Sequence, residues 1–417
     1  MDGVILKEIK VNGCHVDYHF EATGILKPYF TTNTLFIEYQ EDVSSVPQSL
    51  LAAPFVASII PLMWVTNTVM WVKELDKSFY DAIIRIHDAY QRLYSHYPLR
   101  GNLIPANFIE NELVEKRNSL LLFSGGLDAN CTYVRIRNTK PLLFNIQGWY
   151  KQLSDTDYAA DADIRDINAF AKREGLEFTS AKSNFAVVVS ENLWKKNIQP
   201  KFGDSWWHGF NHSMAFISIA IPIAWIYGIK NIFIASSVPM GEFCMCASHV
   251  TTDSEFRFAQ FGKCVHDGSE LVRQEKVQTV VKYQKATGKP YPIRVCSFND
   301  HNCCECEKCF RTVLGLVAEA AEVRDYGFHI QKTLKEHWAD VMFRRSGLMS
   351  FKSERVLHWP YIISRMKENY DYMNQEQKEF VDWFLTFDFK KAKKRGVMRY
   401  YKRNFFSILK RKISQCL

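Results

Sequence analysis

Ser119-Leu-Leu-Leu-Phe-Ser-Gly-Gly-Leu-Asp-Ala-Asn130 is the stretch that predicts the fold of this chain. Its apolar run ends at Ser124-Gly125-Gly126, and a helix is expected to begin at Leu127-Asp128. The glycines let backbone N–H groups approach an anion, and the helix that follows presents its positive end. Ser124 adds a hydroxyl donor, and Asp128 adds a carboxylate that can hold a cation. We predict a phosphate-binding loop, with an ordinary strand–turn–helix connection as the alternative, because Gly-Gly marks turns in many proteins.

Strands and helices alternate after this loop, which predicts an α/β fold with a doubly wound parallel sheet. The expected strands cover residues 141–146, 176–180 and 231–237, and the expected helices cover residues 163–174 and 212–227. In such sheets ligands collect at the carboxyl ends of the strands. We therefore expect residues 124–128, 145–148 and 236–241 to lie around one site.

Two other kinds of nucleotide loop are excluded, because the chain has no G-x-x-x-x-G-K-[ST] motif and no G-x-G-x-x-G after a strand. Phe123-Ser-Gly-Gly-Leu-Asp128 resembles instead the pyrophosphate loop of the PP-loop ATP pyrophosphatases, an adenine nucleotide alpha hydrolase-like superfamily with a HUP-type domain. That superfamily includes GMP and NAD synthetases, tRNA-thiolating enzymes and the 7-cyano-7-deazaguanine synthases of queuosine biosynthesis. The resemblance implies that ATP is cleaved between its α- and β-phosphates and that a substrate is adenylated.

The resemblance also implies a set of site residues. Ser124 and Asp128 would be catalytic, with Mg²⁺ as the cation. ATP would be bound by the loop and by the end of the next expected strand, through Ser124, Gly125, Gly126, Leu127, Asp128 and Asn145. The family motif continues with Ser or Thr where this chain has Ala129, so one hydroxyl contact to phosphate is missing, and Thr132 is not expected to replace it.

Cysteines cluster late in the chain, where four of the eleven lie between Cys303 and Cys309. This is typical of a metal site in a reducing cytosol. The spacing C-x6-C-x2-C-x2-C lets four thiolates converge on one tetrahedral ion, and these are Cys296, Cys303, Cys306 and Cys309. Zinc in a structural role is favoured because four thiolates close its coordination sphere; an iron–sulfur cluster is the alternative. Cys304 is left over, and His301 is an alternative ligand.

The 7-cyano-7-deazaguanine synthases have a similar four-cysteine zinc site followed closely by an arginine, so the resemblance gives Arg311 a catalytic role. It covers residues 119–317, about half of the chain. His208 and His212 are four residues apart and could line one helix face beside a substrate or nucleotide, with structural histidines as the equal alternative. Cys244 and Cys246 would need partners to form a second metal pair, and they are interpreted as surface or core thiols.

Three regions are expected. Residues 1–112 form an α+β region, residues 113–325 the PP-loop domain with its zinc-binding segment 296–311, and residues 326–417 a helical region. No charged residue occurs between Asp42 and Lys73, a length that would span a membrane. Prolines and polar residues within it favour a buried helix near residues 50–60 and a strand near 68–72. No signal peptide is apparent.

The C-terminal residues 390–417 contain eleven Lys or Arg and no acidic residue, whereas the whole chain has a net charge of +8. Basic and aromatic side chains are mixed there, which suits an anionic membrane surface or a nucleic acid, although charged tails are usually only solubilising. We expect a cytoplasmic protein, with peripheral contact at the inner membrane surface favoured over RNA. We also expect a weakly held homo-oligomer.

The predicted function is an ATP-dependent carbon–nitrogen ligase that forms AMP and pyrophosphate. A carboxylate or amide oxygen of a small molecule or modified base would attack the α-phosphate, and ammonia or an amine would then displace AMP. One alternative is tRNA sulfur transfer through the same adenylation. Another is a non-catalytic nucleotide- and zinc-binding scaffold attached to a membrane, which Ala129 supports.

Overall fold

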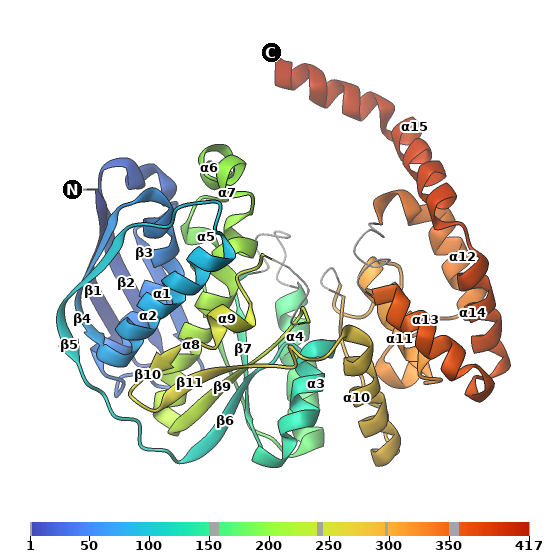
Figure 1. Ribbon diagram of the computed structural model, residues 1–417, viewed down its shortest axis with the longest axis horizontal. Helices are drawn as coiled ribbons and strands as arrows, with labels where there is room; N and C mark the ends of the chain where they lie inside the picture. Colours follow the sequence, from blue (N-terminus) through green and yellow to red (C-terminus); the bar gives the residue numbers. More distant parts are fainter. Residues whose placement is uncertain (1, 150–157, 240–244, 297–298, 350–357, 417) are drawn as a thin grey trace. The chain divides into compact units, whose positions relative to one another are not determined.

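The computed structural model describes residues 2–149, 158–239, 245–296, 299–349 and 358–416 of the 417-residue chain. The chain forms two compact units, Met1–Leu271 and Val272–Leu417 (Figure 1). The first unit is built on a sheet and the second on helices. Each is described by itself below.

Strands of the first unit form one sheet, and the described residues contribute eleven to it, in the order β10-β11-β9-β6-β7-β8-β3-β2-β1-β4-β5. They are β1 (Gly3–Asn12), β2 (His15–Ala22), β3 (Thr34–Tyr39), β4 (Val69–Asp76), β5 (Asn102–Ile109), β6 (Arg117–Leu122), β7 (Leu142–Gln147), β8 (Phe178–Ser183), β9 (Ile229–Ala235), β10 (Arg257–Phe258) and β11 (Gly262–Asp267). Neighbouring strands from β11 through β9, β6 and β7 to β8 are parallel, as are the β1–β4 and β4–β5 pairs. The expected α/β class with a mostly parallel sheet is confirmed.

Helices of the first unit are α1 (Gln48–Thr66), α2 (Lys77–Leu93), α3 (Leu127–Ile136), α4 (Tyr158–Glu174), α5 (Phe185–Val188), α6 (Glu191–Asn197), α7 (Gln199–Phe202), α8 (His212–Tyr227) and α9 (Val250–Asp253). Short 3₁₀ turns η1 (Gly24–Tyr29) and η2 (Arg137–Thr139) and the π-helix η4 (Trp207–Asn211) complete them. The π-helix is followed directly by α8, so the two form one continuous helical segment.

The direction of winding reverses between β6 and β9. From β6 the chain passes through β7 to β8, and it later returns to β9 on the other side of β6. Because parallel crossovers are right-handed, the helices before and after the reversal lie on opposite faces of the sheet. α3 and α4 contact strands β6 to β9, while α8 contacts these strands and also packs on α1. A crevice therefore opens between the carboxyl ends of β6 and β9, where ligands bind in open α/β sheets.

The apolar stretch between Asp42 and Lys73 is core, as expected. It forms α1 and the start of β4, and every side chain from Ser49 to Val65 is buried. α1 and Trp207–Tyr227 are both long and apolar enough to cross a membrane, yet 94% and 78% of their apolar windows are buried inside the protein. A helix with apolar residues on all sides must be buried on all sides. These two helices bury part of each other's surface, because α1 packs on α8.

The N-terminal strands extend the sheet of the predicted nucleotide domain. β3 pairs antiparallel with β8, bringing Ile37 opposite Ser183 and Tyr39 opposite Ala181. The boundary expected near residue 112 therefore falls inside the first unit. The boundary expected near residue 325 falls inside the second unit, which begins at Val272.

Helices of the second unit are α10 (Arg273–Thr287), α11 (Glu307–Ala318), α12 (Leu334–Arg345), α13 (Trp359–Glu368), α14 (Gln375–Thr386) and α15 (Phe389–Cys416), with 3₁₀ turns η5 (Val323–Tyr326), η6 (Ser346–Leu348) and η8 (Tyr370–Tyr372). An aromatic core of Phe310, Trp338, Trp359, Phe384 and Phe389 joins α11 to α15. Residues 350–357 of the expected helical region lie outside the described part.

The basic tail is the long helix α15. Its first turns are held by the unit, because the Ser346 hydroxyl donates to the carbonyl of Ala392 at 2.8 Å. Gly396 is required there, since a Cβ at this position would lie 2.4 Å from the backbone nitrogen of Gly347. The Arg399 guanidinium lies over the Phe343 ring, 4.0 Å from its centre. The start of the tail is thus a packed part of the fold.

Candidate functional site

The loop after β6 is shaped by two features of its sequence. Gly125 has φ +72°, a left-handed conformation that disfavours any side chain with a Cβ. The Asn130 side-chain amide, on the first turns of α3, donates to the carbonyls of Gly125 and Gly126, both at 2.9 Å. Gly126 caps α3 without a side-chain bond to its N–H groups. The Asn130 side chain therefore holds the loop in place, and the N–H groups at the N-terminus of α3 are available to bind an anion.

A cavity lies at this loop, at the carboxyl ends of the parallel strands. It is lined by Leu122, Phe123, Ser124, Gly126, Asp128, Ala129, Phe144, Asn145, Ile146, Trp149, Asp163, His212, Phe216, Ile234, Ala235, Ser237 and Ser248. The structure thus brings together Ser124, Gly126, Asp128 and Asn145 from the predicted site. Gly125 and Leu127 shape the loop without lining the cavity. The lining is mostly apolar with a few polar groups, the usual make-up of a small-molecule site.

Asn145 supplies an unused acceptor to this cavity. Its side chain is 6% exposed, and its Nδ2 donates to the carbonyl of Phe123 at 3.0 Å, which ties the end of β7 to the loop. Its Oδ1 is buried and has no hydrogen-bond partner within the described protein. A buried amide oxygen without a partner costs about 1–3 kcal/mol. A donor on a bound ligand, such as an amino or hydroxyl group, would remove that cost.

Ala129 also lines the cavity, 5% exposed, where the resembled motif has a hydroxyl. Thr132 does not replace that hydroxyl, as expected. One turn further along α3, its Oγ1 donates to Asp267 at the end of β11, at 2.8 Å. The loop therefore offers the Ser124 hydroxyl and the backbone as its neutral donors.

Two carboxylates face the cavity, Asp128 from α3 and Asp163 from α4. Asp163 is 3% exposed, and the sequence analysis did not single it out. A pair of carboxylates is the ligand type that Mg²⁺ prefers beside phosphates. The signal that could have found Asp163 is weak, since it is one of several acidic residues in a helix with no distinctive spacing.

Arg311 lies on α11 in the second unit, with the cysteine cluster. Ser124 and Asp128 belong to the first unit. The role of Arg311 beside these residues stays a prediction.

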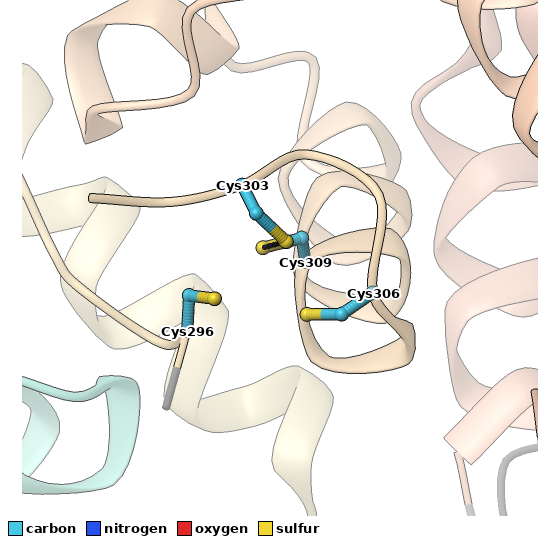
Figure 2. Close-up of side chains that lie close together, drawn as sticks. All are labelled: Cys296, Cys303, Cys306 and Cys309. Carbon is cyan, nitrogen blue, oxygen red and sulfur yellow. Dashed lines mark hydrogen bonds between the residues drawn. The ribbon is translucent and has the colours of Figure 1, made fainter. Parts of the chain in front are cut away.

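The four predicted cysteines come together in the second unit, with their sulfur atoms turned toward one centre (Figure 2). All four Sγ atoms lie within 4.8 Å of one another, and those of Cys303 and Cys309 are 3.9 Å apart. Zinc–thiolate bonds of about 2.3 Å place tetrahedral sulfurs about 3.8 Å apart. The cluster is therefore compatible with zinc.

The protein scaffold around the cluster explains this geometry. Cys306 caps α11 and Cys309 is on its first turn, while the backbone N–H of Glu305 donates to the Cys303 sulfur at 3.4 Å. Asn302 joins the arm that carries Cys296 to the loop, because its Oδ1 accepts from the N–H of Val295 at 2.9 Å. Its Nδ2 donates to the carbonyls of Ile293 and Gly327 at 2.8 and 3.1 Å.

Cys304 is outside the cluster, as expected, and His301, the alternative ligand, is not among the grouped side chains of the described residues. Cys304 has a positive φ of 51° and directs its sulfur to the carbonyl of Asn302. His301 is 72% exposed and pairs with Asp300 at 2.5 Å.

Cys246 was interpreted as a surface or core thiol, and its surroundings differ from both. Its sulfur lies 3.9 Å from Nε2 of His212 on α8, which lines the cavity, and His208 on η4 lowers its pKa. The sequence suggested the two histidines but gave no sign that a cysteine 34 residues beyond His212 meets them. Cys244 lies outside the described residues.

Comparison with protein-family models found no match to this chain, and comparison with curated proteins found no significant match.

Proposed function

We propose that this protein is an ATP-dependent ligase of the PP-loop type, which adenylates a carboxylate or amide oxygen and releases pyrophosphate. The observation that carries the proposal is the Ser124–Asp128 loop at a cavity on the crevice between β6 and β9. A glycine turn, an uncapped helix start and two carboxylates meet there. This is the combination that an anionic, metal-bound triphosphate requires.

In this proposal, backbone N–H groups of the loop and the Ser124 hydroxyl hold the leaving pyrophosphate. Asp128 and Asp163 hold Mg²⁺, which neutralises charge on the phosphates. The substrate oxygen attacks the α-phosphate in line with the departing pyrophosphate. Catalysis by such a site is positioning and electrostatic stabilisation, because the protein forms no covalent bond in this step.

The four-cysteine cluster fits a structural zinc ion that would hold Cys296 and Cys303 to the start of α11. The cluster resembles that of the 7-cyano-7-deazaguanine synthases, and this supports a small molecule or modified base as the acceptor, with ammonia or an amine as the second substrate.

Ala129 favours one alternative, a nucleotide-binding scaffold without turnover. A hydrogen bond to a charged group contributes about 1.5–3 kcal/mol, so a missing hydroxyl at phosphate would weaken the site without removing it. Ala129→Ser separates the two functions. We expect it to tighten ATP binding in either case and to increase turnover only in an enzyme.

The test incubates the purified full-length protein with Mg²⁺, ATP and an ultrafiltered small-molecule extract of the native cells. Chromatography should detect AMP and pyrophosphate in equal amounts. Asp128→Asn, which keeps the side-chain volume but removes the charge, should lower that rate at least about 100-fold. Formation of ADP and phosphate, or a rate unaffected by Asp128→Asn, would show that the proposal is wrong.

A further inference from the structure

Cys246 lies beside an oriented imidazole. The His212 Nδ1–H donates to the carbonyl of Trp207 at 2.8 Å, which leaves Nε2 facing the Cys246 sulfur at 3.9 Å. A main-chain carbonyl thus fixes the tautomer in which Nε2 can take a proton from a thiol. This is the spatial relation of a nucleophile and its general base.

A second imidazole, that of His208, acts on the same thiol through its charge. Its Nδ1 hydrogen-bonds to Asp204 at 2.7 Å. Asp204 is itself held, because it accepts from the Tyr94 hydroxyl at 3.2 Å and from the N–H of Ser205 at 2.7 Å. Asp204 thus holds His208 as a cation, and His212, whose Nε2 faces the sulfur, is the base.

The backbone after Cys246 is pinned. The hydroxyls of Tyr90, Ser213 and Thr252 all donate to the carbonyl of Ala247, at 2.8, 2.7 and 3.2 Å. The Ala247 N–H donates to the carbonyl of His208 at 2.7 Å. Such anchoring holds the thiol in place without using its sulfur, as a preorganised reactive group requires.

This group adjoins the cavity of the Ser124 loop. His212, which faces the Cys246 sulfur, and Ser248, two residues after Cys246, both line that cavity together with Asn145 and Asp128. Trp149, another lining residue, stacks on Trp207 with ring centres 5.6 Å apart. The thiol is thus a neighbour of the place where the proposed adenylate would form.

The charges around the sulfur favour a thiolate. Burial would raise the pKa of Cys246, but hydrogen bonds from His208 and His212 outweigh it and lower the pKa to about 6. Hydrogen bonds to Asp204 and Cys246 raise the pKa of His208 to about 10. Three other titratable groups act on the sulfur or on these histidines: Asp253 on α9, Tyr90 on α2 and Tyr94 at the C-terminal end of α2. Burial raises the pKa of both tyrosines, so they stay neutral near pH 7.

We propose that Cys246 is a covalent nucleophile that takes the acyl group from the adenylated substrate. This inference rests on the proposed adenylation. The Cys246 sulfur bonds to the acyl carbon, the bond from that carbon to the AMP oxygen breaks, and AMP leaves with the electron pair. An amine then attacks the thioester, and the thiolate leaves with the electron pair of the carbon–sulfur bond. The amine proton passes to His212 Nε2. Asp204 is a positioning residue, because it stabilises the protonated form of His208.

The probe for this step is an adenosine 5′-vinylsulfonamide, which carries an electrophilic carbon where the acyl carbon of an adenylate would lie. Full-length protein is incubated with it near pH 7, and intact mass and peptide mapping locate the adduct. We expect one adduct on Cys246, prevented by excess ATP and slowed at least 10-fold by His212→Gln. Cys14→Ala is the matched control, because Cys14 is an exposed thiol and its loss should leave labelling unchanged. Peptide mapping of the protein without substitutions locates the adduct, so the test does not depend on whether a variant folds.

ATP binding measured on the same protein separates the outcomes. If ATP binds but the probe labels other residues, or labels Cys246 regardless of ATP, the covalent role is wrong and the adenylation proposal stands. If ATP does not bind at all, both are wrong. A second zinc ion per chain that disappears in Cys246→Ala would also overturn the covalent role, because the thiolate would then be a metal ligand.

Discussion

The two units use cysteine in opposite ways. In the second unit four sulfurs face one another, and four thiolates repel unless a cation lies between them. In the first unit the Cys246 sulfur faces the His212 imidazole, and His208, paired with Asp204, supplies positive charge from the protein itself. The first arrangement suits metal binding and the second suits nucleophilic chemistry. What surrounds a thiol, and not its presence, decides between these uses.

The largest effect should come from opening the cluster. Cys309→Ser removes one of four ligands from the first turn of α11, so we expect loss of the metal and destabilisation of the second unit by at least about 4 kcal/mol. Metal analysis and thermal unfolding followed by circular dichroism measure the two effects. Cys304→Ser is the control, because this neighbouring buried thiol is outside the cluster and the metal should remain. Full metal content in Cys309→Ser would show that the cluster is not the site.

A smaller effect should distinguish Cys246 from the other thiols. With a pKa of about 6, Cys246 is mostly thiolate at pH 7. Iodoacetamide should therefore alkylate it about 2- to 3-fold faster than an ordinary thiol, because the larger thiolate fraction outweighs the lower nucleophilicity of a more acidic thiol. The rate should fall as the pH drops through 6, because protonation removes the nucleophile. Peptide mapping of timed samples gives this rate. A chelator should expose the cluster thiols to alkylation and leave the Cys246 rate unchanged; equal changes at both sites would contradict the comparison.

The smallest effect should follow from Asp204→Asn. The hydrogen bond to Asp204 is the main cause of the raised pKa of His208, so the neutral amide should lower that pKa toward its ordinary value. Neutral His208 stabilises the thiolate less, and the alkylation midpoint of Cys246 should move up by about one pH unit. The same pH series measures it. Asp267→Asn, which alters a carboxylate bonded to Thr132 and Arg135, should leave the midpoint unchanged.

The expected strands, the glycine turn and the cysteine cluster were accessible from the sequence for one reason. Each depends on residues close together in the chain. The segment from Ser119 to Asn130 contains its own strand end, turn and helix start. The segment from Cys296 to Cys309 contains all four clustered cysteines and Asn302, which bonds to the backbone of Val295. Local periodicity and spacing describe such features completely.

The remainder of the site depends on contacts between distant segments. The Asn145 Oδ1 faces the site only because β7 lies beside β6, where the Asn145 Nδ2 donates to the carbonyl of Phe123. Asp163 reaches the cavity from α4, and its sequence neighbours include other acids of no evident role. The continuity of the N-terminal strands with β8 depends on the pairing of Ile37 with Ser183 across 146 residues. No pattern within either segment specifies that pair.

The sequence by itself determined the parallel α/β unit, the glycine turn between β6 and α3 and a four-cysteine cluster, because hydrophobic period, glycine conformation and cysteine spacing act within a few residues. Only the tertiary structure decided what lies around the loop. Burial of the uniformly apolar α1 and α8 against each other and the sheet fixes where His208 and His212 emerge, and the hydroxyls that hold Ala247 bring Cys246 to them. The pKa of that thiol is a property of the packed core.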